Sequence, residues 1–190
     1  LHFIKAYHPL LIKTNESLGI TTHPQTIQLS PEGRLLVISG PNAGGKSITL
    51  KTVGLLQVMF QSGLLIPVSP ASEVGTFDSI LTDIGDNQSI ENQLSTYSYR
   101  LSRMKHFLHV SDEKSLLLLD EFGTGSDPEL GGALAEVFFE ELYKRGVFGV
   151  ITTHYANIKS RAAELSRAIN ASMLFDRDTL APLFKLQIGQ

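Results

Sequence analysis

One glycine-rich segment constrains the fold of this chain more than any other feature of its sequence. Residues 40–47 have the sequence GPNAGGKS, which is the complete pattern G-x-x-x-x-G-K-[ST] of a phosphate-binding loop. The apolar run before it, residues 35–39, predicts a buried strand, and the helical spacing of apolar residues over 47–61 predicts a helix. This order of strand, loop and helix is the context in which the pattern binds phosphate.

Each residue type in this loop has a physical role in holding phosphate. Glycines let backbone N–H groups turn toward phosphate oxygens, and the start of a helix adds positive potential. Lys46 would place its charge at the β- and γ-phosphates, and the Ser47 hydroxyl would be a ligand of Mg²⁺. The alternative, a glycine-rich turn with an incidental lysine, is less consistent with the flanking strand and helix. The candidate nucleotide-binding residues are Gly40, Pro41, Asn42, Ala43, Gly44, Gly45, Lys46, Ser47 and Ile48.

An acidic pair follows a run of four leucines further along the chain. Residues 115–120 predict a buried strand that ends at Asp120, and Glu121 comes directly after it. Asp120 would hold Mg²⁺ opposite Ser47, while Glu121 would orient or deprotonate an attacking water. Alone, this pattern indicates only a strand that ends in solvated acids. Together with the phosphate loop it predicts the second half of one site.

A histidine follows the next predicted strand, residues 147–152. His154 lies in the sequence TTHY, and a histidine beside a phosphate site can hydrogen-bond the γ-phosphate or the attacking water. A single histidine in such a position is otherwise a turn or capping residue. Because two other motifs of the same chemistry are present, we favour the catalytic interpretation. The candidate catalytic residues are therefore Lys46, Glu121 and His154.

The remaining periodicity predicts alternating strands and helices. Uninterrupted apolar central strands indicate a mainly parallel sheet that is covered on both faces. The predicted fold class is α/β, a P-loop NTPase with helices flanking the sheet, in one domain of residues 1–190. Short strands are expected within residues 1–34, a strand at 77–83, helices at 91–110, 129–145 and 156–166, and two strands between 168 and 188.

The composition excludes several classes of protein. Sixteen Lys and Arg against nineteen Asp and Glu give a net charge of -3, which does not predict a basic face for nucleic acid. The absence of cysteine excludes disulfides and thiolate metal sites, and it agrees with a cytoplasmic location. The uncharged stretch 52–72 contains glutamines, a glycine and prolines, so it is not expected to span a membrane. Because the chain begins with Leu1, we expect it to be a fragment of a longer protein.

Together these motifs resemble the MutS family of ABC-class ATPases, which act in DNA mismatch repair and recombination control. The resemblance rests on the phosphate loop with Asn42, the Asp-Glu pair, the TTHY sequence and residues 94–98 (LSTYS). Residues 83–91 (DIGDNQSIE) and 123–128 (GTGSDP) resemble the second bacterial branch of the family more than the mismatch-binding branch. The resemblance implies an ABC-like ATPase domain of a bacterial cytoplasmic protein, with short strands at both ends, that hydrolyses ATP to ADP and phosphate with Mg²⁺.

The resemblance further implies a site that two chains share. In ABC-class ATPases a signature segment of one subunit caps the γ-phosphate of the other, and Ser95 and Thr96 hold that position here. The alternative is that these two residues only cap a helix. By position, the family suggests Phe184, with His23 or Ile20, as contacts of the adenine base, although a phenylalanine on a strand is more often part of the core. It also implies a homodimer, and DNA bound through domains that are absent here.

Two other functions are also compatible with the sequence. Another ABC-class ATPase, such as a transporter subunit or a chromosome-maintenance protein, usually has LSGG where this chain has LSTY. A nucleotide-binding module with little turnover is the second alternative, and Glu121 and His154 argue against it. The family normally continues with a dimerising segment after the position of Gln190, so weak activity is expected of this piece alone.

Overall fold

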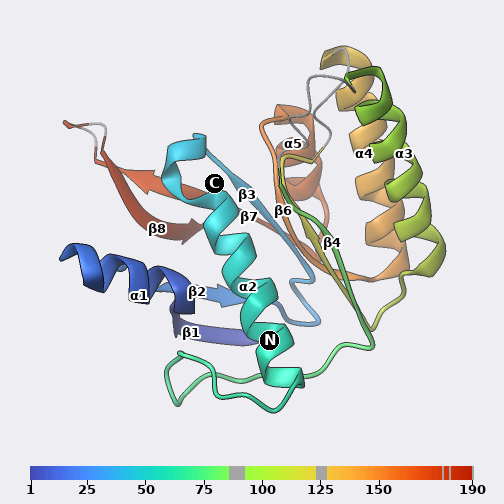
Figure 1. Ribbon diagram of the computed structural model, residues 1–190. Coiled ribbons are helices and arrows are strands. Elements are labelled where there is room, and N and C mark those ends of the chain that lie inside the picture. The colour runs from blue at the N-terminus through green and yellow to red at the C-terminus, as the bar shows by residue number, and fades with distance from the viewer. Residues whose placement is uncertain (86–92, 123–127, 177, 180, 190) are drawn as a thin grey trace.

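The computed structural model describes residues 1–85, 93–122, 128–176, 178–179 and 181–189 of the chain. Its centre is a six-stranded sheet with the strand order β4-β5-β6-β3-β7-β8 (Figure 1). Neighbours from β4 to β7 pair in parallel, and β8 pairs antiparallel with β7. The strands are β3 (Leu35–Ser39), β4 (Ser79–Asp83), β5 (Ser115–Leu119), β6 (Phe148–Thr152), β7 (Ala168–Phe175) and β8 (Pro182–Ile188). The mainly parallel α/β sheet is thus confirmed.

Helices cover both faces of this sheet. Alternate side chains of the central strands point to opposite sides, so each face presents apolar residues that a layer of helices buries. Leu36 and Ile38 belong to a core formed with α2, whereas Leu35 and Val37 belong to a core formed with α3, α4 and α5. All five residues of β3 and of β5 are buried, as strands covered on both faces require. The helices are α2 (Lys46–Gln61), α3 (Gln93–Val110), α4 (Pro128–Arg145) and α5 (Ala156–Glu164).

The first part of the chain forms a small separate sheet with a helix between its strands. The strands β1 (His2–Ala6) and β2 (Gln25–Gln28) pair antiparallel and agree with the predicted short strands. The prediction of strands only is wrong for Pro9–Leu18, which form α1. Helix α1 has good end signals, since His8 Nδ1 accepts a hydrogen bond from Leu11 N at 3.4 Å and Gly19 ends it in a left-handed conformation. It buries no residue, which explains why apolar periodicity did not reveal it.

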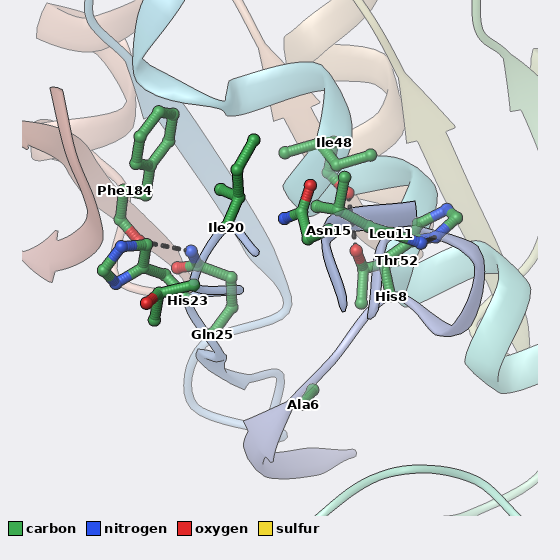
Figure 2. A pocket seen from close by; sticks show the side chains of 11 residues that line it. Ala6, His8, Leu11, Asn15, Ile20, His23, Gln25, Ile48, Thr52 and Phe184 are labelled. Atoms are coloured by element: carbon green, nitrogen blue, oxygen red, sulfur yellow. Dashed lines mark hydrogen bonds between the residues drawn. The ribbon is translucent and has the colours of Figure 1, made fainter. Parts of the chain in front are cut away.

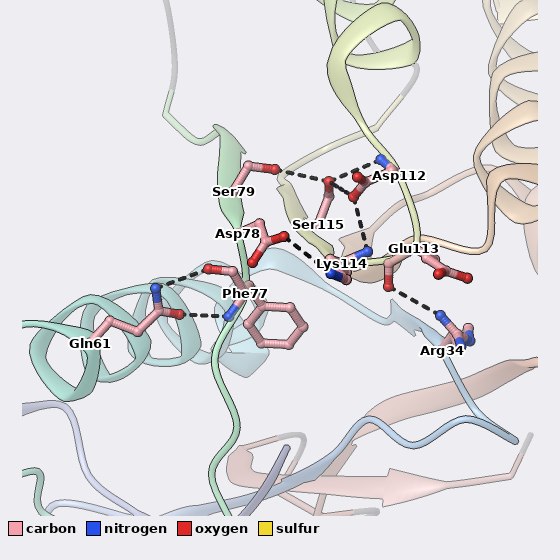
Figure 3. Close-up of polar contacts among 9 residues, drawn as sticks. All are labelled: Arg34, Gln61, Phe77, Asp78, Ser79, Asp112, Glu113, Lys114 and Ser115. Atoms are coloured by element: carbon pink, nitrogen blue, oxygen red, sulfur yellow. Dashed lines mark hydrogen bonds and ion pairs between the residues drawn. The ribbon is translucent and has the colours of Figure 1, made fainter.

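Polar contacts hold together the edge at which β4 and β5 begin (Figure 3). The Ser79 hydroxyl donates to the Ser115 hydroxyl at 2.9 Å, and Ser115 in turn donates to Asp112 Oδ1 at 2.9 Å. The Gln61 side chain, at the end of α2, accepts from Phe77 N at 2.9 Å and donates to Phe77 O at 3.1 Å. These bonds fix the point where the chain enters β4 and β5. Their carboxyl ends therefore lie at the opposite edge of the sheet.

The uncharged stretch 52–72 does not form one long helix. Its first part belongs to α2, which ends at Gln61, and Gly63 follows with a left-handed backbone. Within the described ranges, no helix combines the length and the apolar character that crossing a bilayer requires.

Candidate functional site

Three of the predicted segments meet at the carboxyl edge of the central strands. β6 lies between β3 and β5, so the residues that follow these strands are neighbours. Thr153 N donates to Ile38 O at 3.2 Å, and Phe122 N donates to Thr152 O at 2.8 Å. The glycine-rich loop that begins at Gly40 and the acidic pair therefore lie on either side of the end of β6. The structure thus brings the glycine-rich loop and the Asp120–Glu121 pair together, as the sequence predicts.

The backbone of the loop needs glycine at specific positions. Gly45 has a φ of 94°, a left-handed conformation that side chains disfavour, and it directly precedes α2. At Gly44 the reason is space, because a Cβ there would lie 2.8 Å from the Cβ of Met173 in β7. Residues Asn42–Gly44 form a 3₁₀ turn between β3 and Gly45. The compact loop is thus pressed against β7 and leads into the start of a helix.

Lys46 lies beneath this loop, with 1 % of its surface exposed. Its ammonium group donates a hydrogen bond to the carbonyl of Gly40. Burial lowers the pKa of Lys46, and the charges of Asp120 and Glu121 partly offset this effect. A buried ammonium group is costly unless anions compensate it. This site therefore holds a positive charge between the loop and the acidic pair.

Thr152 fixes the acidic pair from the neighbouring strand. Its hydroxyl donates to Asp120 Oδ1 at 2.5 Å and accepts from Glu121 N at 2.8 Å. The hydroxyl of the next residue, Thr153, donates to Phe122 O at 3.2 Å. Both threonines are fully buried. The sequence pattern predicts no separate role for these threonines beyond their place in the TTHY sequence, at the end of a strand beside an acidic strand end.

Glu121 has an unusual backbone for a residue with a side chain. Its φ is 50°, in the left-handed region, which costs about 1–2 kcal/mol for a residue other than glycine. The hydrogen bond from its N–H to Thr152 holds this conformation. Such strain is found most often where a side chain must point in a functional direction. The direction in which the half-buried Glu121 side chain leaves the backbone is therefore set by this left-handed conformation as well as by its rotamer.

Replacing Thr152 by valine should lower the free energy of unfolding by about 2 kcal/mol. Valine has nearly the same shape, but both hydrogen bonds of the hydroxyl are lost, and the half-buried Asp120 carboxylate and Glu121 N–H group each lose a partner. Denaturant unfolding would measure this difference. Thr82→Val, on the exposed side of β4, is the matched control and should change stability little. Equal stability of the Thr152 variant and the parent chain would contradict the bridging role.

The other predicted residues differ in how far the structure places them. His154 is exposed and follows β6, two residues before α5 begins. Ser47 is half-buried in the first turn of α2. The backbone of Ser95 and Thr96 belongs to α3, but their side chains lie outside the described residues, as does the segment 123–127. No group of three or more histidine, aspartate or glutamate side chains that could hold a metal is found among the described residues.

A cavity of about 350 Å³ lies next to the loop, between α1 and α2 (Figure 2). Its wall includes Ile20, His23, Ile48 and Phe184, all of which the sequence analysis named. The rings of His23 and Phe184 are stacked, with centroids 5.7 Å apart and an angle of 22° between their planes. Phe184 also contacts the loop, because a Cβ at Gly45 would lie 3.3 Å from its Cδ1. Phe184 therefore belongs to the cavity wall and also lies against the loop.

Comparison with known proteins agrees with this arrangement. Residues 36–190 match the family model described as MutS domain V. The chain belongs to the MutS domain V family. The resemblance to MutS proteins that the motifs predict is thereby confirmed. The matched range contains the loop, the acidic pair, His154 and Phe184, whereas His23 and α1 precede it.

The similar proteins also bear on the branch of the family that the sequence predicts. The chain is 46% identical over 198 residues to "Endonuclease MutS2" of Ligilactobacillus salivarius and 45% identical over 190 residues to "Endonuclease MutS2" of Carboxydothermus hydrogenoformans. These alignments cover 99% and 100% of this chain but 25% and 24% of the relatives. The chain spans about a quarter of the length of these curated relatives, and their names support the predicted second branch.

Proposed function

We propose that this chain is the ATP-binding and ATP-hydrolysing domain of a MutS-like protein that acts in DNA repair or recombination. The observation that carries the proposal is the buried Lys46, held between a glycine-rich loop and the Asp120–Glu121 pair. A buried cation beside a helix start is suited to a polyphosphate. The match to MutS domain V supports this function and makes a transporter subunit a poorer candidate.

The phosphate side of the site would work mainly by positioning and by neutralising charge. Lys46 and the backbone N–H groups of the loop hold the phosphates. Asp120 and Ser47 offer carboxylate and hydroxyl oxygens, which fit Mg²⁺ together with substrate phosphates, and Thr152 fixes the Asp120 carboxylate. When bound, Mg²⁺ supplies positive charge to the phosphate oxygens. Glu121 orients and deprotonates the attacking water, and His154 hydrogen-bonds the γ-phosphate.

The cavity beside the loop is the proposed place for the adenine base. An aromatic pair and apolar walls suit a flat heterocycle, and Phe184 lies against the loop that would hold the phosphates. His23 and Ile20 would complete the contacts from the segment after α1. ATP and ADP are then the proposed ligands.

The complete ATPase site would form between two copies of the ABC-like domain. In this proposal Ser95 and Thr96 of one chain cap the γ-phosphate bound to the other, in a cytoplasmic homodimer that binds DNA through parts of the longer protein. The motif resemblance supports this arrangement. A nucleotide-binding module with little turnover is the remaining alternative, since the chain covers only about a quarter of its relatives.

Titration of the chain with ATP, in MgCl₂ and in EDTA, would test the proposed function. We expect binding in both conditions and at least about tenfold tighter binding with Mg²⁺, because the metal ion would supply positive charge to the phosphate oxygens. Calorimetry would measure the affinity, and release of inorganic phosphate would measure turnover. Absence of binding with Mg²⁺ would contradict the function. Tight binding without phosphate release would favour the module with little turnover.

A further inference from the structure

Gln25 of β2 contributes an unusual polar group to the cavity wall. It is 6 % exposed, and its Nε2 donates to the backbone carbonyl of Phe184 at 2.5 Å (Figure 2). A carbonyl can only accept, so the amide nitrogen must face Phe184 and the amide oxygen must be at the other end. That oxygen, Oε1, is buried and has no hydrogen-bond partner among the residues that the structure describes.

Three other polar side chains of the cavity, those of His8, Asn15 and Thr52, have internal partners. Asn15 Nδ2 donates to Thr22 Oγ1 at 3.0 Å, and the Thr52 hydroxyl donates to Ile48 O at 2.6 Å. His8 caps α1, and burial, followed by the charge of Lys51, lowers its pKa and favours the neutral ring. Buried polar atoms without partners are rare in native proteins. The oxygen of Gln25 is therefore the acceptor in this wall that a ligand is best placed to satisfy.

We propose that Gln25 selects adenine, because its Oε1 accepts a hydrogen bond from the exocyclic amine of a base bound in this cavity. The inference rests on the proposed function, since it assumes that the base of ATP occupies the cavity. Adenine carries an amino donor at the position where guanine carries an oxygen acceptor. A guanine in the same pose would bring two acceptors together, and a purine without the amine would leave Oε1 unpaired.

The same side chain positions the ring that would contact the base. Phe184 has a φ of 50°, and the bond from Gln25 Nε2 to its carbonyl supports this backbone conformation. Oε1 is covered in this structure, so a base reaches it after a lining side chain turns aside. Gln25 thus connects recognition of the base to the phenylalanine that touches Gly45.

The experiment compares ATP with purine riboside triphosphate, which differs by lacking the amine, and with GTP. Affinities are measured by competition against a fluorescent ATP analogue for the parent chain, Gln25→Met and Gln28→Met. Gln28 is exposed on the same strand and serves as the matched control. We expect the parent chain to prefer ATP by roughly 10- to 100-fold, the effect of one unpaired buried acceptor. Gln25→Met should lose this preference, and Gln28→Met should keep it.

Three other results would contradict the inference, and each would do so in a different way. Equal binding of ATP and the analogue by the parent chain would overturn the role of Gln25 and leave ATP binding intact. If Gln25→Met weakened both ligands but kept the preference, Gln25 would only position Phe184, and the inference would be wrong. If no nucleotide bound, the proposed function and the inference would both fail. Thermal unfolding by circular dichroism checks the variants, and the comparison on the parent chain decides the matter if Gln25→Met does not fold.

Discussion

Replacing Lys46 by methionine is expected to lower the affinity for ATP by at least about 100-fold. The ammonium group would make charge-assisted hydrogen bonds to phosphate, and each such bond contributes about 1.5–3 kcal/mol. Methionine has a similar length but neither charge nor donors. The loss should not come from unfolding, because the buried charge itself opposes folding. Calorimetric titration with ATP, together with the thermal midpoint of unfolding, would separate the two effects.

Lys51→Met provides the control for this experiment, because Lys51 is an exposed lysine on the same helix. It should retain the affinity of the parent chain. The affinity of the parent should also fall as pH rises through the pKa of Lys46, which burial lowers, because the charged form binds phosphate. The Lys46 variant should lack that pH dependence. ATP binding at parental strength by Lys46→Met would remove the loop from the nucleotide site.

Replacing Glu121 by glutamine is expected to preserve ATP binding within a few-fold and to reduce phosphate release by about 10²- to 10⁴-fold. This range is the usual contribution of a positioned general base. Glutamine keeps the size of the side chain, and the hydrogen bond from residue 121 N–H to Thr152 involves only the backbone of that residue. Single-turnover measurement of phosphate release would detect the loss of chemistry without interference from product release.

Glu113→Gln is the matched control, since Glu113 is exposed at the opposite edge of the sheet. It should hydrolyse ATP at the parental rate. Because Glu121→Gln would keep ATP bound, sedimentation velocity of this variant with and without Mg-ATP also tests the proposed dimer. A shift to dimer only with ATP would support the shared site. Parental turnover by Glu121→Gln would exclude Glu121 from the mechanism.

The elements of the central sheet could be predicted because their sequences carry local signals. The strand at 35–39 matches β3, and the predicted helix at 47–61 matches α2 to within one residue. Long apolar runs and helical spacing report burial directly. The loop pattern was equally informative, since its glycines are required by a positive φ and by the close approach of β7.

The contacts that complete the site could not be predicted in the same way. Thr152 joins Asp120 and Glu121 across neighbouring strands, and Gln25 reaches the carbonyl of Phe184 from a part of the chain 159 residues away. Neither contact leaves a periodic or compositional trace. Helix α1 was missed for a related reason, because it is stabilised at its ends and buries no apolar face.

The position of β3 in the sheet determines when the site can form during synthesis. β3 pairs only with strands made much later among those described: Leu35 lies opposite Gly149 of β6 and Ala168 of β7. The glycine-rich loop follows β3 directly, and its close neighbour Met173 also comes from β7. Such distant pairing is slow to form, and it exposes apolar strand edges until the partners arrive. On the ribosome the loop sequence therefore emerges early, but a chain that stopped before β7 would carry the motif without the strand against which the loop packs.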